Sequence, residues 1–160
     1  MFSGMDFPGA GASKLVIGVG NEFRGDDAAG LIVARRIIEQ QLSDIEVVES
    51  GGHSAALLEL WRGAELAVVV DAVSAGEKPG KVYRFEPIKE PIPQKLFSNR
   101  STHDFGLVEA VELSRALGSL PKKLIVYGIV GATFELGESI SEEMALAIEE
   151  IIPIIVAYIS

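Results

Sequence analysis

Three acidic residues and a histidine stand where apolar runs of this chain give way to loops. Asp26 and Asp27 end the loop after one such run, and Asp71 directly follows another. His103 comes just before a stretch in which apolar residues recur at helical spacing. Carboxylate oxygens and an imidazole nitrogen can hold a divalent metal ion or move protons in a hydrolysis. The chain has no cysteine, so thiol nucleophiles and cysteine metal ligands are excluded.

The segment around Asp26 and Asp27 has the pattern of a strand, a loop and a helix. Residues 15–19 form a β-branched apolar run that predicts a buried strand, and a helical pattern begins at Ala28. One aspartate is therefore expected to cap the helix, and if this is Asp26, its replacement by Asn should cost about 1 kcal/mol or less. The other carboxylate is left at the tip of the strand, where open α/β sheets bind their ligands.

The alternation of apolar runs with amphipathic stretches predicts a three-layer αβα fold of the α/β class. We expect a twisted, mostly parallel sheet of about five strands with helices on both faces. The strand at 81–85 is expected to return beside the strand at 66–70 as an antiparallel edge strand. Ser101, Thr102 or Asp104 is expected to cap the helix that follows them. The expected strands are residues 15–19, 45–50, 66–70, 81–85 and 123–130, and the expected helices are residues 31–42, 54–61, 107–117 with a stop at Gly118, and a last one that contains Pro153 and is capped by Ser139 or Ser141.

This topology brings the candidate residues to one place. Because the carboxyl ends of parallel strands share one edge of a sheet, the loop with Asp26 and Asp27 and the strand end at Asp71 should open onto the same crevice. His103 could reach it from the loop after an irregular segment, residues 87–100. The residue types alone leave two possibilities open, a divalent metal site or carboxylates and a histidine that only satisfy backbone groups.

Composition limits the protein to one domain and disfavours several classes of partner. Residues 14–160 are expected to form a single α/β domain behind a disordered N-terminus at residues 1–13. The net charge of −9 opposes binding to nucleic acid and to anionic membranes. The N-terminus lacks a signal-peptide pattern, and the longest apolar run is broken by Pro153 and too short to span a bilayer. We therefore expect a cytoplasmic protein, and we expect it to act as a monomer.

A nucleotide-binding module is one alternative that fits part of the sequence. Gly18 and Gly20 follow a strand, as the first two glycines of a dinucleotide fingerprint do. Phe23 stands at the place of the third glycine, however, and the paired aspartates would repel a bound phosphate. These residues disfavour the nucleotide-binding function without excluding it.

A serine hydrolase is the second alternative. Ser54, Asp71 and His103 occur in the chain order of the α/β-hydrolase triad, and Ser54 lies in a loose copy of the nucleophile elbow. Ala56 replaces the last glycine of that elbow, and Ser54 is more simply expected to cap the helix at 54–61. A hydrolase of this kind is therefore the weaker explanation of the same residues.

Taken together, several segments resemble the maturation endopeptidases of nickel-iron hydrogenases. The resemblance covers almost the whole chain from Lys14 onward. It implies an aspartyl-type endopeptidase that removes a C-terminal extension from the hydrogenase large-subunit precursor after nickel insertion. It also implies three metal ligands, which fall on Asp27, Asp71 and His103. The matching segments are GVGN at 18–21, GDD at 25–27, GG at 51–52, Asp71 after its apolar strand, STHDFGL at 101–107 and YGI at 127–129.

The implied activity assigns chemistry to these residues. With no cysteine and only a weak serine candidate, peptide hydrolysis would proceed by attack of water activated by a carboxylate or a metal ion. Asp27, Asp71 and His103 can supply these groups, so they are the expected catalytic residues as well as the implied ligands. Nickel is expected to arrive with the precursor, and zinc or cadmium to replace it in the isolated protein. The chain departs from the family pattern at Ala28, where glycine is frequent, and at His53, where a small hydroxyl residue is frequent. His53 could line the same crevice as an additional ligand or substrate contact, but we expect it to be a surface residue.

Overall fold

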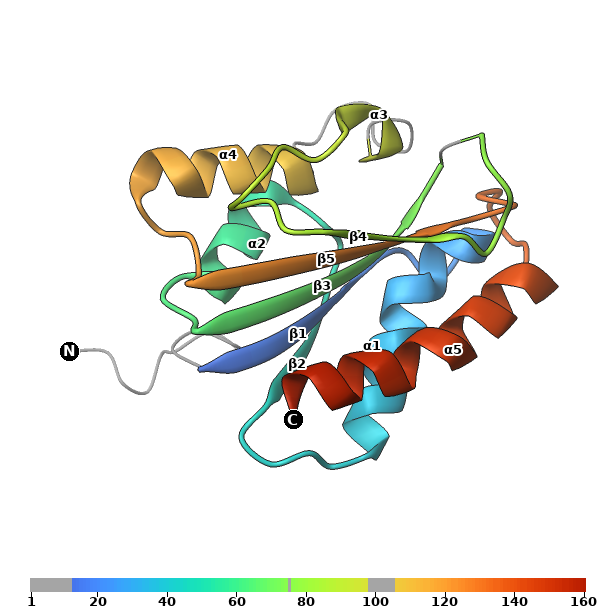
Figure 1. Ribbon diagram of the computed structural model, residues 1–160. Helices are drawn as coiled ribbons and strands as arrows, with labels where there is room; N and C mark the ends of the chain where they lie inside the picture. Colours follow the sequence, from blue (N-terminus) through green and yellow to red (C-terminus); the bar gives the residue numbers. More distant parts are fainter. Residues whose placement is uncertain (1–12, 75, 98–105) are drawn as a thin grey trace.

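A five-stranded sheet lies between two pairs of helices in the computed structural model, which describes residues 13–74, 76–97 and 106–160 (Figure 1). The strand order is β2-β1-β3-β5-β4. The first four of these strands are parallel, and β4 runs antiparallel to β5. The elements are β1 (Lys14–Val19), the 3-10 helix η2 (Gly25–Ala28), α1 (Ala29–Glu39), β2 (Glu46–Ser50), α2 (Ser54–Trp61), β3 (Leu66–Val73), β4 (Val82–Phe85), α3 (Gln94–Phe97), α4 (Leu107–Leu117), β5 (Lys123–Val130) and α5 (Glu142–Ile159).

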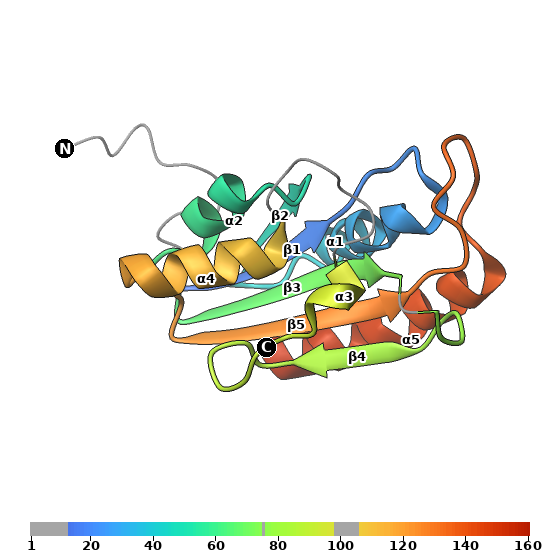
Figure 2. The same cartoon turned by 90° about the horizontal axis from the view of Figure 1, so that it is seen from above.

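The central strands β1, β3 and β5 are mainly apolar because helices cover both of their faces; their charged residues are Asp71 in β3 and the lysines at the start of β1 and β5. Helices α1 and α5 lie on one face and α2 and α4 on the other (Figures 1 and 2). Successive side chains of β3 alternate between the two cores: Val68 and Val70 pack toward α1 and α5, whereas Ala67 and Val69 pack toward α2 and α4. The predicted three-layer fold, with a mostly parallel sheet and an antiparallel edge strand, is therefore confirmed.

Two details of the sheet differ from the prediction. Strand β3 continues to Val73, so that Asp71 lies inside a strand and not directly after it. The edge strand β4 pairs with β5 and not with β3. The loop after β3 therefore carries the chain past the position of β5, and β5 later fills the place between β3 and β4.

The helix ends follow local sequence only in part. Gly118 ends α4 in the left-handed conformation with φ 67°, and Ser141 caps α5 by accepting a 3.1 Å hydrogen bond from the Met144 backbone N–H, as predicted. The cap of α4 is Gly106, so the expectation that residue 101, 102 or 104 caps this helix is wrong. Those three residues lie outside the described part of the chain, as do residues 1–12 of the segment expected to be disordered.

Two further expectations about chain segments need correction. Helix α1 ends at Glu39 and not at residue 42, because the backbone turns into the left-handed region at Gln41. The segment at residues 87–100, expected to be irregular, contains the short helix α3. Among the described residues, no helix is both long enough and apolar enough to cross a membrane.

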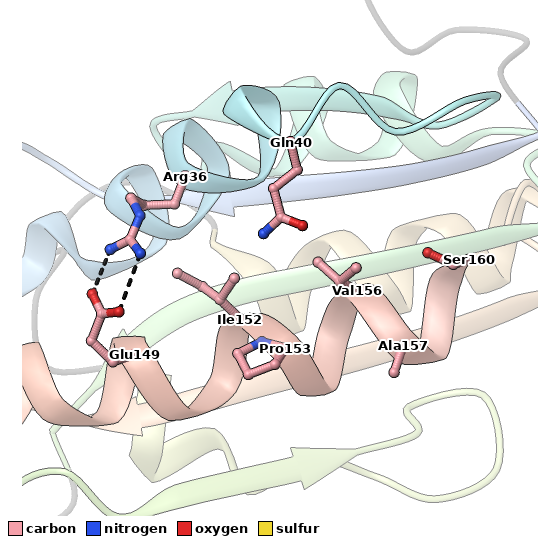
Figure 3. A pocket seen from close by; sticks show the side chains of 8 residues that line it. All are labelled: Arg36, Gln40, Glu149, Ile152, Pro153, Val156, Ala157 and Ser160. Atoms are coloured by element: carbon pink, nitrogen blue, oxygen red, sulfur yellow. Dashed lines mark hydrogen bonds and ion pairs between the residues drawn. The ribbon is translucent and has the colours of Figure 1, made fainter.

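Helices α1 and α5 enclose a groove on one face of the molecule (Figure 3). Arg36 of α1 and Glu149 of α5 form a two-bonded ion pair across it. The groove runs toward the C-terminus of α5, where Lys14 Nζ at the start of β1 donates a 3.0 Å hydrogen bond to the carbonyl of Ile159. It therefore extends toward the amino ends of the strands, away from the edge at which the candidate residues were expected.

Candidate active site

Asp71 is a buried carboxyl near the carboxyl end of β3. Only 3% of the residue is exposed, and its neighbours along the strand are apolar and buried. Burial raises the pKa of the Asp71 carboxyl from 3.8 to about 8, while a hydrogen bond from the Ala72 backbone lowers it. The group therefore holds a proton at neutral pH unless a cation compensates its charge. A carboxyl in such a position is typical of functional sites.

Asp27 belongs to the 3-10 helix that follows the first strand. Its carbonyl accepts a 3.2 Å hydrogen bond from the Asn21 backbone N–H, and its own N–H donates a 3.0 Å bond to the Arg24 carbonyl. These bonds close the loop into a compact turn at the carboxyl end of β1. The side chain of Asp27 is half-buried, and its Oδ1 atom is shielded from solvent. These two bonds fix the local backbone conformation around Asp27.

The first turn of α1 lies directly on the two strands that carry these loops. A Cβ atom built on Gly30 would lie 2.2 Å from the Val19 carbonyl oxygen and 2.4 Å from the Val70 carbonyl oxygen. Only glycine permits this approach. Since Asp27 lies just before α1 and Asp71 just after Val70, the close packing holds the two acidic segments near the same edge of the sheet, and η2 contacts β3 directly.

Asp26 has a different role from the one predicted. Neither η2 nor α1 has a side-chain cap, so the expectation that one of the paired aspartates caps the helix is wrong. Asp26 is fully buried, and its carboxylate accepts hydrogen bonds from Ala132, Thr133 and Ser141 in the loop between β5 and α5. These partners lie more than a hundred residues away in the sequence, and no local pattern could have identified them.

Of the remaining predicted residues, His53 and Ser54 lie at the start of α2. His103 lies outside the described residues, so its predicted place in the site stays a prediction. His53 is exposed and occupies the N-cap position of α2. Ser54 is consequently the first residue of the helix, and its predicted capping role is wrong. The turn between strand β2 and the helix is made by other residues, so Ser54 does not hold the place of a nucleophile elbow.

The donor set suits a divalent cation if the predicted histidine is included. Asp27 and Asp71 offer carboxylate oxygens from separate elements, and His103 would add an imidazole nitrogen, a combination used for zinc and nickel. The residues that the structure describes contain no group of three or more acidic or histidine side chains placed to hold a metal ion. The predicted site therefore depends on His103 as the third ligand.

Two surface hollows are lined by parts of the chain that follow β1 and β3. One, of about 640 Å³, begins at Ser74, three residues after Asp71 on the same chain segment. The other, of about 340 Å³, lies at the end of β1 and includes Phe23, which is 65% exposed. The larger is lined by Ser74, Gly76, Glu77, Tyr83, Pro93, Lys95 and Leu96, and the smaller by Gly20, Asn21, Glu22, Phe23, Leu31, Arg35, Glu49, Ser50 and Gly51.

Comparison with known proteins gives a consistent result. The profile of the hydrogenase maturation protease family, HycI, matches residues 33–158, a segment that contains Asp71 and His103 and begins after Asp27. The hydrogenase 2 maturation protease of Escherichia coli (strain K12) is 29% identical over 125 residues, which are 76% of this chain and 74% of that protein. The hydrogenase expression/formation protein HupD of Thiocapsa roseopersicina is 30% identical over 118 residues, and the matched part covers 72% of this chain but only 52% of HupD, about half its length.

A solved structure shows the same architecture. The hydrogenase maturating endopeptidase HybD from E. coli superimposes with a TM-score of 0.75 and 25% sequence identity, over 90% of each chain. The sheet with one antiparallel edge strand, the paired layers of helices and the family match over 126 residues, counted from 33 to 158, therefore agree with one another. From this agreement we conclude that the chain belongs to the hydrogenase maturation protease family, whose members are endopeptidases.

Proposed function

We propose that this protein removes a C-terminal extension from the large-subunit precursor of a nickel-iron hydrogenase after nickel has been inserted, and that it recognises the nickel itself. Family membership supports a hydrogenase precursor as the substrate. The observation that carries the proposal is the pair of carboxyls on Asp27 and Asp71, which come from separate elements to one edge of the sheet. Carboxylates at this edge could bind a nickel ion that the precursor already holds through its own ligands.

Asp27, Asp71 and His103 are the proposed ligands and catalytic residues. Bound nickel would supply a Lewis acid that polarises a nearby carbonyl. Asp71 must lose its proton before it can bind a cation, because burial keeps it protonated at neutral pH. Three side-chain ligands leave coordination positions free for the groups of the precursor. The protein would thus complete the coordination of an ion that the substrate brings.

The protein's own residues also suit the hydrolysis. The chain lacks cysteine, and Ser54 does not hold the place of a nucleophile elbow, so we propose water as the nucleophile and the carboxylate of Asp27 or Asp71 as the group that accepts its proton. The carboxyl that accepts this proton would then return it to the leaving amine. Asp71 is buried and Asp27 is half-buried, so the two carboxyls have different environments.

The surface beside the acidic pair suits an extended polypeptide. The hollow after β3 contains Tyr83 and Leu96 as apolar walls and Lys95 at its edge. The hollow after β1 contains the exposed ring of Phe23. Residues of the precursor on the two sides of the cleaved bond would contact these hollows, which would help to select one position near the end of the substrate.

Mass spectrometry of the precursor tests the proposal. The purified precursor of a cognate large subunit is incubated with the protein in its nickel-loaded form and in its nickel-free form. We expect the loaded form alone to be shortened at its C-terminus. Equal cleavage of both forms would remove nickel recognition from the proposal, and a lack of cleavage of every cognate precursor would remove the function. The Asp27→Asn variant serves as the control for contaminating proteases.

A further inference from the structure

A fully buried carboxylate fastens two distant loops to each other. Oδ1 of Asp26 accepts a 2.6 Å hydrogen bond from the Ser141 backbone N–H. Its Oδ2 accepts a 2.7 Å bond from the Ser141 hydroxyl, a 2.6 Å bond from the Ala132 backbone N–H and a longer contact of 3.4 Å from that of Thr133. Asp26 has no exposed surface. Burying a carboxylate is unfavourable unless hydrogen-bond donors surround it. The donors from residues 132, 133 and 141 therefore stabilise the Asp26 carboxylate in this buried position.

The backbones of the two loops are paired in both directions around this carboxylate. The Asp26 N–H donates a 2.8 Å hydrogen bond to the Thr133 carbonyl, and the Gly25 N–H donates a 3.1 Å bond to the Glu138 carbonyl. In return, the Gly137 N–H donates a 2.8 Å bond to the Phe23 carbonyl. Figure 2 shows the loop after β1 in blue beside the loop between β5 and α5 in orange. The loop that bears Asp27 therefore has a partner along much of its length.

The residue that follows β5 packs closely against Asp26. A Cβ atom built on Gly131 would lie 2.9 Å from the Asp26 Cβ, so the end of β5 passes directly against this side chain. Ser141 is itself constrained, because its hydroxyl donates to Asp26 while it accepts from Met144 as the cap of α5. Asp26 thus connects the loop between β1 and α1, which bears Asp27, to the start of the long helix α5, which packs against the sheet.

We propose that Asp26 is a positioning residue of the active site, which fixes the loop so that the neighbouring Asp27 presents its carboxylate to the bound metal. Adjacent residues of a tight turn point in different directions, and here the Asp26 side chain points into the protein while Asp27 is partly exposed. The inference rests on the proposed function in one respect, because it assumes that Asp27 is a ligand. It contradicts the expectation from sequence that replacing Asp26 by Asn lowers the stability by only about 1 kcal/mol or less.

The alternative is that Asp26 only stabilises the fold. Both roles predict a lower free energy of unfolding for Asp26→Asn, since an amide would set its NH₂ group against the donors that now surround the carboxylate. Only a positioning role predicts a weaker metal site in protein that is still folded. Metal affinity measured well below the unfolding temperature therefore separates the two roles.

The experiment uses calorimetric titration of the metal-free protein with zinc, and circular dichroism to confirm folding. Four variants are compared with the wild type: Asp26→Asn, Ser141→Ala, Asp27→Asn and Glu22→Gln. Glu22 is the matched control because it lies in the same loop, is exposed and makes a surface ion pair with Arg35. We expect Asp27→Asn to abolish binding and Asp26→Asn to weaken it on the order of tenfold, as is typical when the support of a metal ligand is lost.

The remaining variants keep the inference falsifiable. Ser141→Ala removes one donor and leaves the backbone donors in place, so it should weaken zinc binding less than Asp26→Asn, and Glu22→Gln should not change it. If folded Asp26→Asn binds zinc as the wild type does, Asp26 is only structural and the inference is wrong. If Asp26→Asn does not fold, Ser141→Ala decides: weaker binding supports the inference and unchanged binding overturns it. Unchanged binding by Asp27→Asn would instead overturn the proposed ligand set.

Discussion

The indole Nε1–H of Trp61 donates a 2.8 Å hydrogen bond to the hydroxyl oxygen of Ser114 in the interior of the molecule. Trp61 is the last residue of α2, and Ser114 lies in the middle of α4. Both residues are completely buried. This bond joins the two helices that cover one face of the sheet, and it satisfies the one polar atom of a side chain that otherwise fills an apolar core.

Ser114→Ala should lower the free energy of unfolding by about 1–3 kcal/mol, because it leaves the buried indole N–H without an acceptor. Urea unfolding followed by circular dichroism measures the change. Ser119→Ala is the matched control, since the Ser119 hydroxyl oxygen is buried and makes no hydrogen bond within the described part of the chain. The control should be nearly neutral. Equal losses in both variants would show that the Trp61 bond contributes nothing specific.

The stability of the metal-free protein should fall as pH rises from about 4 to about 8. In that window the folded protein holds a proton on Asp71, whose pKa is raised by burial from 3.8 to about 8, whereas the unfolded chain has lost it. The folded state therefore binds more protons, and a rise in pH favours unfolding. Above pH 8 both states are ionised and the contribution of Asp71 becomes constant.

Asp71→Asn provides the comparison for this pH dependence. The amide is close in size to the acid and does not titrate, so the fall in stability between pH 5 and pH 8 should be smaller in the variant. Urea midpoints at several pH values, with a chelator present, give the two curves. Parallel curves would mean that Asp71 does not cause the pH dependence and that its pKa in the folded protein is close to its value in the unfolded chain.

The fold was largely predictable because its signals are local. Continuous apolar runs identified the strands at residues 66–70 and 123–130, and helical spacing that ends at Gly118 identified α4. The neighbour of the edge strand β4 was not predictable in this way. A short alternating strand can pair with more than one neighbour in a sheet. Here β5 lies between β3 and β4, so β4 pairs with β5.

The site was predictable to the extent that it depends on topology. Asp27 and Asp71 were placed at one edge of the sheet because parallel strands share their carboxyl ends. The role of Asp26 was missed because its donors come from residues 132–141, and local sequence around an Asp-Asp pair favours a helix cap. A carboxylate satisfied by distant backbone groups leaves no signal in its own segment.

Ser54→Ala should leave cleavage of the precursor nearly unchanged. Ser54 is the first residue of α2 and does not form the turn between strand and helix that a nucleophile elbow requires. Cleavage by the variant, followed by mass spectrometry, and labelling of the wild type with a fluorophosphonate measure this. Loss of cleavage together with labelling at Ser54 would establish a serine hydrolase in place of the proposed mechanism.

Asp27→Asn, Asp71→Asn and His103→Ala should each abolish zinc binding and precursor cleavage while the protein remains folded. Each change removes a proposed ligand, and the two Asn variants keep the size of the side chain. Asp71→Asn should even be more stable than the wild type at pH 8 and above, since it no longer buries a charge. Retained zinc affinity in any one variant would remove that residue from the ligand set.

Zinc binding at pH 7 should release about one proton from Asp71, because a metal ligand must be deprotonated and this carboxyl is protonated in the metal-free protein. Titration calorimetry in buffers of different ionisation enthalpy gives the number of protons released. At pH 9 the carboxyl is already ionised, so the release from Asp71 should vanish and the affinity should be higher. A proton release that stays constant between pH 7 and pH 9 would mean that Asp71 does not bind the metal.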